Sequence, residues 1–61
     1  NEINISSDTP VESVRIFNVN GKLIKEYNQT TIINISFLSQ GIYFIQIESL
    51  NTQRTNKLVK K

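Results

Sequence analysis

Carboxylates are the side chains that this sequence leaves for acid–base chemistry, because it contains neither His nor Cys. His is the commonest general base, a Cys thiolate is a common nucleophile, and both are usual ligands of zinc. The five acids stand singly along the chain, at Glu2, Asp8, Glu12, Glu26 and Glu48. Glycoside hydrolysis needs two carboxylates at a set separation, and strand geometry brings no pair clearly together here. We therefore expect no enzymatic activity and no catalytic residue.

Sites for cofactors and metal ions are equally hard to assemble from these residues. Gly21 and Gly41 are far apart in the chain, whereas phosphate-binding loops gather their glycines within a few positions. Asp8 stands between Ser7 and Thr9, but calcium needs several oxygen ligands, and an ordinary turn explains this residue. The sequence predicts no cofactor and no metal site.

Nucleic-acid binding is an alternative, because small β-barrels bind single strands through basic grooves and exposed aromatic side chains. The aromatic candidates are Phe17, Tyr27, Tyr43 and Phe44. A net charge of +2 is small for a nucleic-acid footprint, and aromatic side chains dominate small cores. We expect these aromatic residues inside the core, and we predict no nucleic-acid partner.

The elements that position these residues are expected to be strands of one domain spanning residues 1–61. Hydrophobic residues make up 38% of the chain and charged residues 20%, which is too apolar for a disordered tail. The apolar residues are mostly Ile, with Val, Leu, Phe and Tyr, which favour strands. No apolar run approaches the roughly 20 residues that cross a bilayer, and no signal-peptide pattern is present. We therefore predict an all-β class with no transmembrane segment.

Turn signals divide the chain into six expected strands, over residues 1–6, 12–19, 22–27, 31–36, 42–49 and 54–61. Segment 42–49 alternates most clearly and places Tyr43, Ile45 and Ile47 on one face. Neither face of segment 12–19 is cleanly polar, so we expect it at the centre of a sheet. The short first strand is expected at an edge. Short strands with hairpin-type links predict an antiparallel sandwich or a small barrel.

Two turns are predicted from their glycines. Asn20-Gly21 lies between two strand-like segments, and this pair is typical of a type I′ hairpin turn with positive φ at both residues. Gly41 is expected at positive φ just before a strand, where a side chain would clash.

Three segments in order resemble one known family. They are Arg-Ile-Phe-Asn-Val-Asn-Gly-Lys at 15–22, Leu-Ser-Gln-Gly-Ile-Tyr-Phe at 38–44, and Lys-Leu-Val-Lys-Lys at 57–61. Together they are similar to the type A C-terminal sorting domain of the type IX, or Por, secretion system of Bacteroidetes. The resemblance covers the chain from Glu12 onward. The proline-containing segment with which this family usually starts is not in the sequence, so a first strand or a cleavage region is expected to lie upstream.

The resemblance implies a compact Ig-like β-sandwich of six to seven strands at the C-terminus of a larger cargo protein. It implies delivery through the periplasm to the surface of a Gram-negative bacterium or beyond. The implied partners are the outer-membrane translocon, its shuttle protein and a sortase-like peptidase that removes the domain. By the same resemblance, Gly21, Gly41 and Tyr43 shape the fold. Lys57, Lys60 and Lys61 form the terminal segment on which export depends.

Two alternatives stay open from the residues themselves. The terminal lysines lie on an expected edge strand, where positive charge also discourages edge-to-edge aggregation. An Ig-like accessory module that stays on its parent protein and binds glycan or protein at the cell surface is the second candidate function. Such a module needs exposed aromatic or polar side chains on one sheet face.

Overall fold

The structure is a computed structural model that describes residues 2–5, 10–50 and 52–61. The turn expected at Asp8 lies outside these residues. The described part of the chain contains no helix and six strands: β1 (Glu2–Asn4), β2 (Val11–Phe17), β3 (Leu23–Asn28), β4 (Ile32–Asn34), β5 (Gly41–Ser49) and β6 (Thr52–Lys60). The all-β prediction is confirmed.

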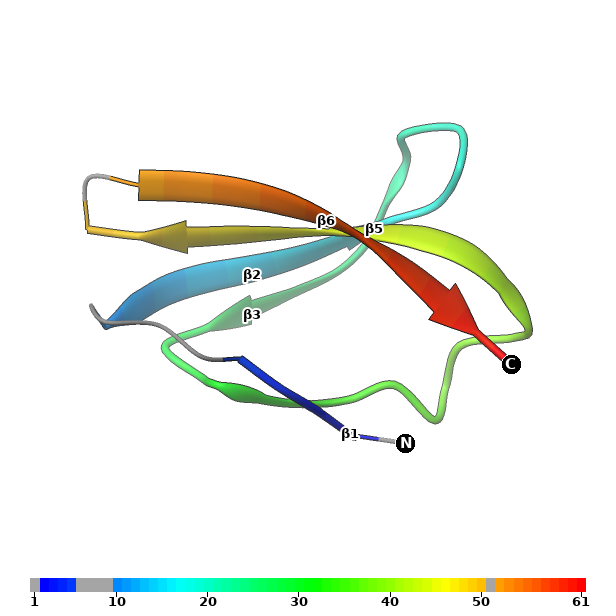
Figure 1. Cartoon of the computed structure of the whole chain (residues 1–61), viewed down its shortest axis with the longest axis horizontal. Helices are drawn as coiled ribbons and strands as arrows, with labels where there is room; N and C mark the ends of the chain where they lie inside the picture. The colour runs from blue at the N-terminus through cyan, green and yellow to red at the C-terminus, as the bar shows by residue number, and fades with distance from the viewer. Residues whose placement is uncertain (1, 6–9, 51) are drawn as a thin grey trace.

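The strands form two antiparallel sheets, as Figure 1 shows. The larger sheet has four strands in the order β3-β2-β5-β6, and the smaller sheet pairs β1 with β4. Strand β2 is central, as predicted, because it pairs with both β3 and β5. Strand β6 pairs with β5 along its whole length and forms one edge of the larger sheet.

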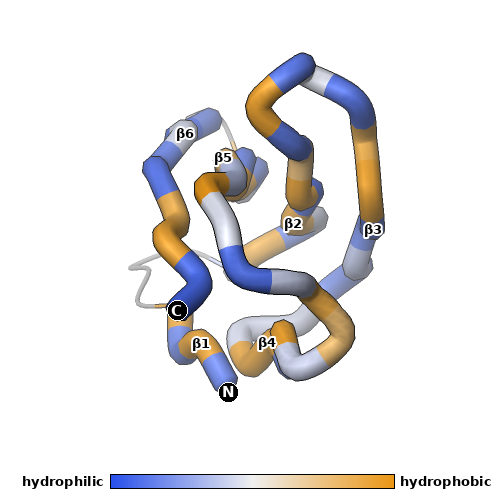
Figure 2. The backbone as a smooth tube through the Cα atoms, turned by 90° about the vertical axis from the view of Figure 1, so that its right-hand side faces the viewer, coloured by the Kyte–Doolittle hydropathy of each residue, from blue (hydrophilic) through white to orange (hydrophobic). Residues whose placement is uncertain are grey.

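The core lies between the two sheets, which Figure 2 shows nearly end-on. Val14 and Ile16 of β2 and Ile33 of β4 have no exposed surface. Each such burial contributes about 1.5–3 kcal/mol of hydrophobic stabilisation. The predicted inner face of β5 is confirmed, since Tyr43, Ile45 and Ile47 are all buried. The period of two along a strand therefore places these side chains correctly.

The smaller sheet covers the core with fewer residues than the sequence suggests. Strand β4 ends at Asn34, where we expected a strand to Ser36. Ile35 and Leu38 follow the strand but are still buried, and the backbone N–H of Leu38 donates to the carbonyl of Ile35. A turn therefore delivers these two side chains to the core instead of a longer strand.

The hairpin between β2 and β3 differs from the predicted turn. Gly21 has a φ of +83°, as expected. Asn20 does not have a positive φ, because Gln29 is the one described non-glycine residue that does. The N–H of Asn18 donates to the carbonyl of Lys22, which closes a loop of residues 19–21. A three-residue loop with a left-handed residue in its last position is a common hairpin alternative. The prediction of a two-residue type I′ turn was therefore wrong.

The side chain of Asn18 explains why the longer loop forms. Its Oδ1 accepts hydrogen bonds from the backbone N–H groups of Asn20 and Lys22, each at 2.9 Å. An Asn carboxamide that bonds the backbone two residues ahead stabilises a turn of its own. These two hydrogen bonds to the Asn18 side chain therefore favour a three-residue loop, in which Val19 is added before the predicted Asn20-Gly21 pair.

Gly41 begins β5 with a φ of +157°, a conformation that other residues rarely adopt. The expected steric clash was wrong: a Cβ at this position would meet only the Tyr43 ring, at ordinary contact distances of 3.8 and 3.9 Å. Tyr43 is buried, and its hydroxyl donates to the carbonyl of Ser39 at 2.8 Å. This bond ties the connection before β5 to the core.

We predict that Gly21→Val lowers the free energy of unfolding by about 1–2 kcal/mol, because a β-branched residue is disfavoured at left-handed φ. Nothing lies within 4 Å of the position that a Cβ would take, so the effect comes from the backbone alone. Gly21→Asn is the control, since Asn tolerates this region. Thermal unfolding followed by circular dichroism measures both, and equal melting temperatures for the Val variant and the original would contradict the expectation.

We predict that Tyr43→Phe lowers the free energy of unfolding by about 0.5–1.5 kcal/mol, the net value of a typical hydrogen bond. The matched control is Tyr27→Phe. The Tyr27 hydroxyl makes only a long, exposed contact of 3.4 Å with the carbonyl of Asn34. Urea denaturation of both variants tests this, and a larger loss in the Tyr27 variant would show that the Ser39 bond is not the important one.

Candidate recognition surface

The three predicted terminal lysines do not share one surface. Lys57 and Lys61 are exposed, whereas Lys60 keeps only 9% of its surface accessible. Alternation along β6 explains this, because Lys60 lies on the same side of the strand as Leu58, which packs against the core. Lys60 lies opposite Gly41, whose missing side chain leaves room beside it. We conclude that the displayed positive charge of the terminal segment comes from Lys57 and Lys61.

Aromatic side chains occupy the outer face of the larger sheet. Of the aromatic residues expected in the core, only Tyr43 is buried; Phe17 and Tyr27 are half-buried, and Phe44 is 36% exposed. The expectation that aromatic residues fill the core was therefore wrong for Phe17 and Phe44. The physical reason is alternation: their neighbours Ile16 and Ile45 take the inward positions.

The outer face divides into an apolar half and a polar half along the strands. One row crosses all four strands and joins Leu23, Phe17, Phe44 and Lys57 in register. The next row joins Ile42 of β5 to Val59 of β6. Leu23, Ile42 and Val59 are 43–52% exposed. We call the five apolar residues of these rows the outer apolar patch: Phe17, Leu23, Ile42, Phe44 and Val59.

Arg15 organises the polar half of the same face. Its Nε donates to Glu26 Oε2 at 2.8 Å, and its Nη1 donates to Gln46 Oε1 at 3.2 Å. A carboxylate oxygen of Glu48 lies 3.9 Å from the same Nη1 and accepts a hydrogen bond from Ser13 at 3.2 Å. Partly exposed ion pairs such as these contribute up to about 1 kcal/mol each. Both carboxylates of this half are therefore engaged inside the domain.

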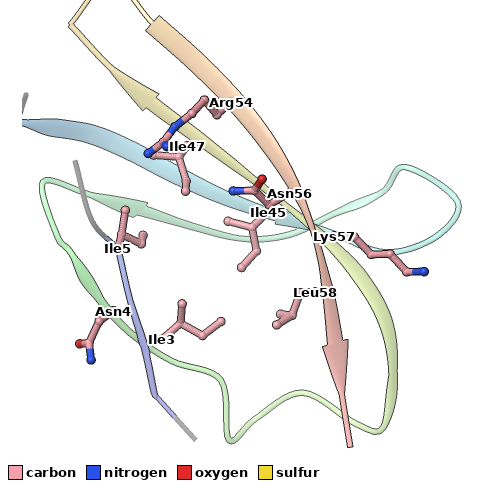
Figure 3. Close-up of a pocket in the computed structure, with 9 residues that line it drawn as sticks. All are labelled: Ile3, Asn4, Ile5, Ile45, Ile47, Arg54, Asn56, Lys57 and Leu58. Atoms are coloured by element: carbon pink, nitrogen blue, oxygen red, sulfur yellow. The ribbon is translucent and has the colours of Figure 1, made fainter. Parts of the chain in front are cut away.

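The opposite side of the larger sheet borders a cavity of about 290 Å³, drawn in Figure 3. Ile3 of β1 and Ile5, which follows this strand, face Ile45 of β5 and Leu58 of β6 across it. The Lys57 side chain points away from the cavity. The remaining lining residues are Asn4, Ile47, Arg54 and Asn56. None of the lining residues that the structure describes is aromatic.

A second open side lies between β3 and the turn after β4. Lys25, Tyr27, Asn34, Ser36 and Phe37 line it. The Lys25 ammonium lies 5.9 Å from the centre of the Tyr27 ring, at the limit of a cation–π contact. Burial raises the pKa of the Tyr27 hydroxyl above its ordinary value of 10.0.

Groupings able to hold a metal ion do not form in the part of the chain that the structure describes. No three carboxylates gather there into a group able to hold a metal ion. Asp8, the residue considered for calcium, lies outside the described residues. Among the described residues, no helix is long and apolar enough to cross a membrane.

A family model described as the secretion system C-terminal sorting domain matches residues 1–61, the whole chain. The chain belongs to this family. The sorting domain is the C-terminal signal for type IX secretion, and it directs its cargo across the outer membrane to the cell surface or beyond. A search of curated proteins found no match, and a search of solved structures also found none. The resemblance seen in the sequence is therefore confirmed at the level of the family.

Sequence reasoning missed the exposure of three apolar residues on the outer face of the larger sheet: Ile42, Phe44 and Val59. A signal was available, because the run Ile42 to Ile45 is apolar at every position and so must place large residues on both faces of the strand. Each of these four residues favours strand structure, so propensity gives no sign of which face the core covers. Only the position of the smaller sheet decides that.

Proposed function

We propose that the sorting domain is recognised by the type IX translocon through the terminal strand β6, with Lys57 and Lys61 making the charge contacts. The observation that supports this most directly is the position of β6 at one end of the strand order β3-β2-β5-β6. An edge strand offers backbone groups to which a partner can add a strand of its own. Two exposed lysines then select a partner that carries carboxylates.

Lys60 has a different role in this proposal. Its burial at the end of β6 packs the aliphatic stem against the domain, which holds the last residues of the strand in place. A sorting signal at the end of a chain needs such an anchor, because terminal residues fray when nothing ties them down. Lys60 therefore positions the recognised segment and makes no contact with the partner.

The wider export route belongs to the same proposal. A shuttle protein receives the domain after the translocon, and a sortase-like peptidase at the outer membrane then removes it from the cargo. The domain itself takes no chemical part in these steps, which agrees with the scattered positions of its carboxylates. Gly21, Gly41 and Tyr43 contribute by maintaining the fold that displays β6.

The function is tested by fusing the domain, with its native upstream linker, to a fluorescent protein exported to the periplasm. We predict that the reporter reaches the surface or medium of a type IX-competent Bacteroidetes strain and stays in the periplasm of a translocon-deficient strain. Periplasmic retention in both strains, with the domain folded, would favour an Ig-like accessory module that binds glycan or protein. The exposed Phe44 would then be its first candidate contact.

The role of β6 is tested with lysine variants of the same fusion. We predict that Lys57→Gln combined with Lys61→Gln reduces the secreted reporter about fivefold or more, because charge contacts to a partner are lost. Lys25→Gln is the control, since Lys25 is an exposed lysine of β3 at the opposite edge of the same sheet. Equal secretion by all the variants would contradict recognition through the lysines of β6.

A further inference from the structure

We propose that the outer apolar patch is a second docking surface, which receives an apolar surface of a type IX secretion protein bordered by carboxylates. This proposal rests on the sorting function. It adds a second contact surface, on the sheet face and separate from the backbone edge of β6. The patch consists of Phe17, Leu23, Ile42, Phe44 and Val59, on the face of the larger sheet that points away from the core.

The outer apolar patch is continuous across neighbouring strands. Scattered exposed apolar residues are normal on protein surfaces and need no explanation. Here one row joins Leu23, Phe17 and Phe44 across three neighbouring strands, and Ile42 with Val59 forms the next row beside it. A contiguous exposed apolar area of this kind marks an interaction site.

A purely structural role explains only part of this arrangement. Phe17 and Phe44 lie opposite each other on β2 and β5, and aromatic cross-strand pairs stabilise sheets even on a solvent face. Ile42 of β5 and Val59 of β6 also lie opposite each other, but this pair contains no aromatic ring and is 43% and 52% exposed. A polar β-branched residue such as Thr would maintain the strand there without exposing apolar surface.

The charges around the patch indicate the chemistry of its partner. Lys57 continues the row of Phe44 on β6 and places positive charge beside the patch. The carboxylates of this face, Glu26 and Glu48, lie in the polar half and interact with Arg15. The patch is therefore bordered by positive charge, and a matching partner has an apolar centre with carboxylates at its rim.

The charge beside the patch argues against a second copy as the occupant. Two copies stacked patch to patch would place Lys57 over a surface without carboxylates, which leaves that charge without a partner. A lipid surface also binds apolar side chains bordered by lysines, and the crosslinking measurement described below separates lipid from protein. A protein surface fits both the flat shape and the charge of the patch.

The test compares two matched pairs of substitutions in the cargo fusion. Phe44→Thr with Val59→Thr removes an aromatic and a β-branched side chain from the patch. Phe37→Thr with Ile32→Thr makes the same chemical change at side chains that are 53% and 56% exposed outside it. We expect the patch pair to reduce the secreted reporter about tenfold, because a few central apolar residues dominate docking affinity, and the control pair to leave secretion unchanged. Equal secretion by both pairs would overturn the proposal.

Folding is controlled by a second measurement that alters the surface very little. A photo-crosslinking phenylalanine derivative replaces Phe44 in the otherwise unchanged fusion, with the same replacement at Phe37 as the control. We expect an adduct at Phe44 alone, identified by mass spectrometry as a type IX protein. An adduct with a second copy of the fusion, an adduct with lipid, or no adduct in a secreting strain would each overturn the proposal.

The outcomes separate this inference from the function on which it rests. Failure of the unsubstituted fusion to leave the periplasm of the competent strain would contradict the sorting function itself. Normal export of the unsubstituted fusion and of the patch pair would leave the sorting function intact and remove only the docking surface. Loss of export in the Lys57 and Lys61 variant with normal export of the patch pair would restrict recognition to the edge of β6.

Discussion

The domain depends on the burial of two neighbouring inward side chains of its central strand, Val14 and Ile16. Both are completely covered, and β2 pairs with a strand on each side. The chain has no Cys for a disulfide and no His or Cys for a structural zinc site. Packing around β2 and the strand ladders must therefore supply the stability, as expected for a chain of 61 residues that buries only about 60% of its unfolded surface.

An unequal pair of sheets follows from this constraint. The smaller sheet has two strands and the larger has four, so the smaller one covers only the inner face of its partner. Apolar residues on the other face stay in solvent, which produces the outer apolar patch. The same inequality leaves the cavity between β1 and β6, where β6 extends beyond the cover of the smaller sheet. The small core and the exposed apolar surface therefore both accompany a second sheet of only two strands in the described part of the chain.

This organisation suits a domain that acts by being recognised. A sorting signal needs a stable shape that displays a chosen surface, and it needs no acid–base pair or metal centre. In the polar half, the carboxylates of Glu26 and Glu48 interact with Arg15 inside the domain. The apolar half and the displayed lysines are the parts that we propose to contact partners. The terminal strand and the patch meet at β6, because Val59 belongs to both and Lys57 lies beside the patch in the row of Phe44.

The amino-acid sequence by itself determined the class, the central place of β2, the set of side chains that share one face of β5, and the family. Period-two alternation decides which side chains share a face, and the three motif segments need no tertiary context to be recognised. It did not determine which face is covered, because Ile16 and Phe17, like Ile45 and Phe44, are equally good strand residues on opposite sides. It also did not determine the three-residue hairpin loop, which depends on bonds from the Asn18 side chain.

Tertiary structure alone decided the surface of this domain. The two-stranded sheet lies over Ile16 and Ile45, so Phe17 and Phe44 face outward even though aromatic residues usually dominate small cores. The side of β6 that faces the core buries Lys60 next to Leu58 and leaves Lys57 exposed, although the sequence makes the two lysines look alike. Burial is a property of what packs against a residue, and that partner comes from a distant part of the chain.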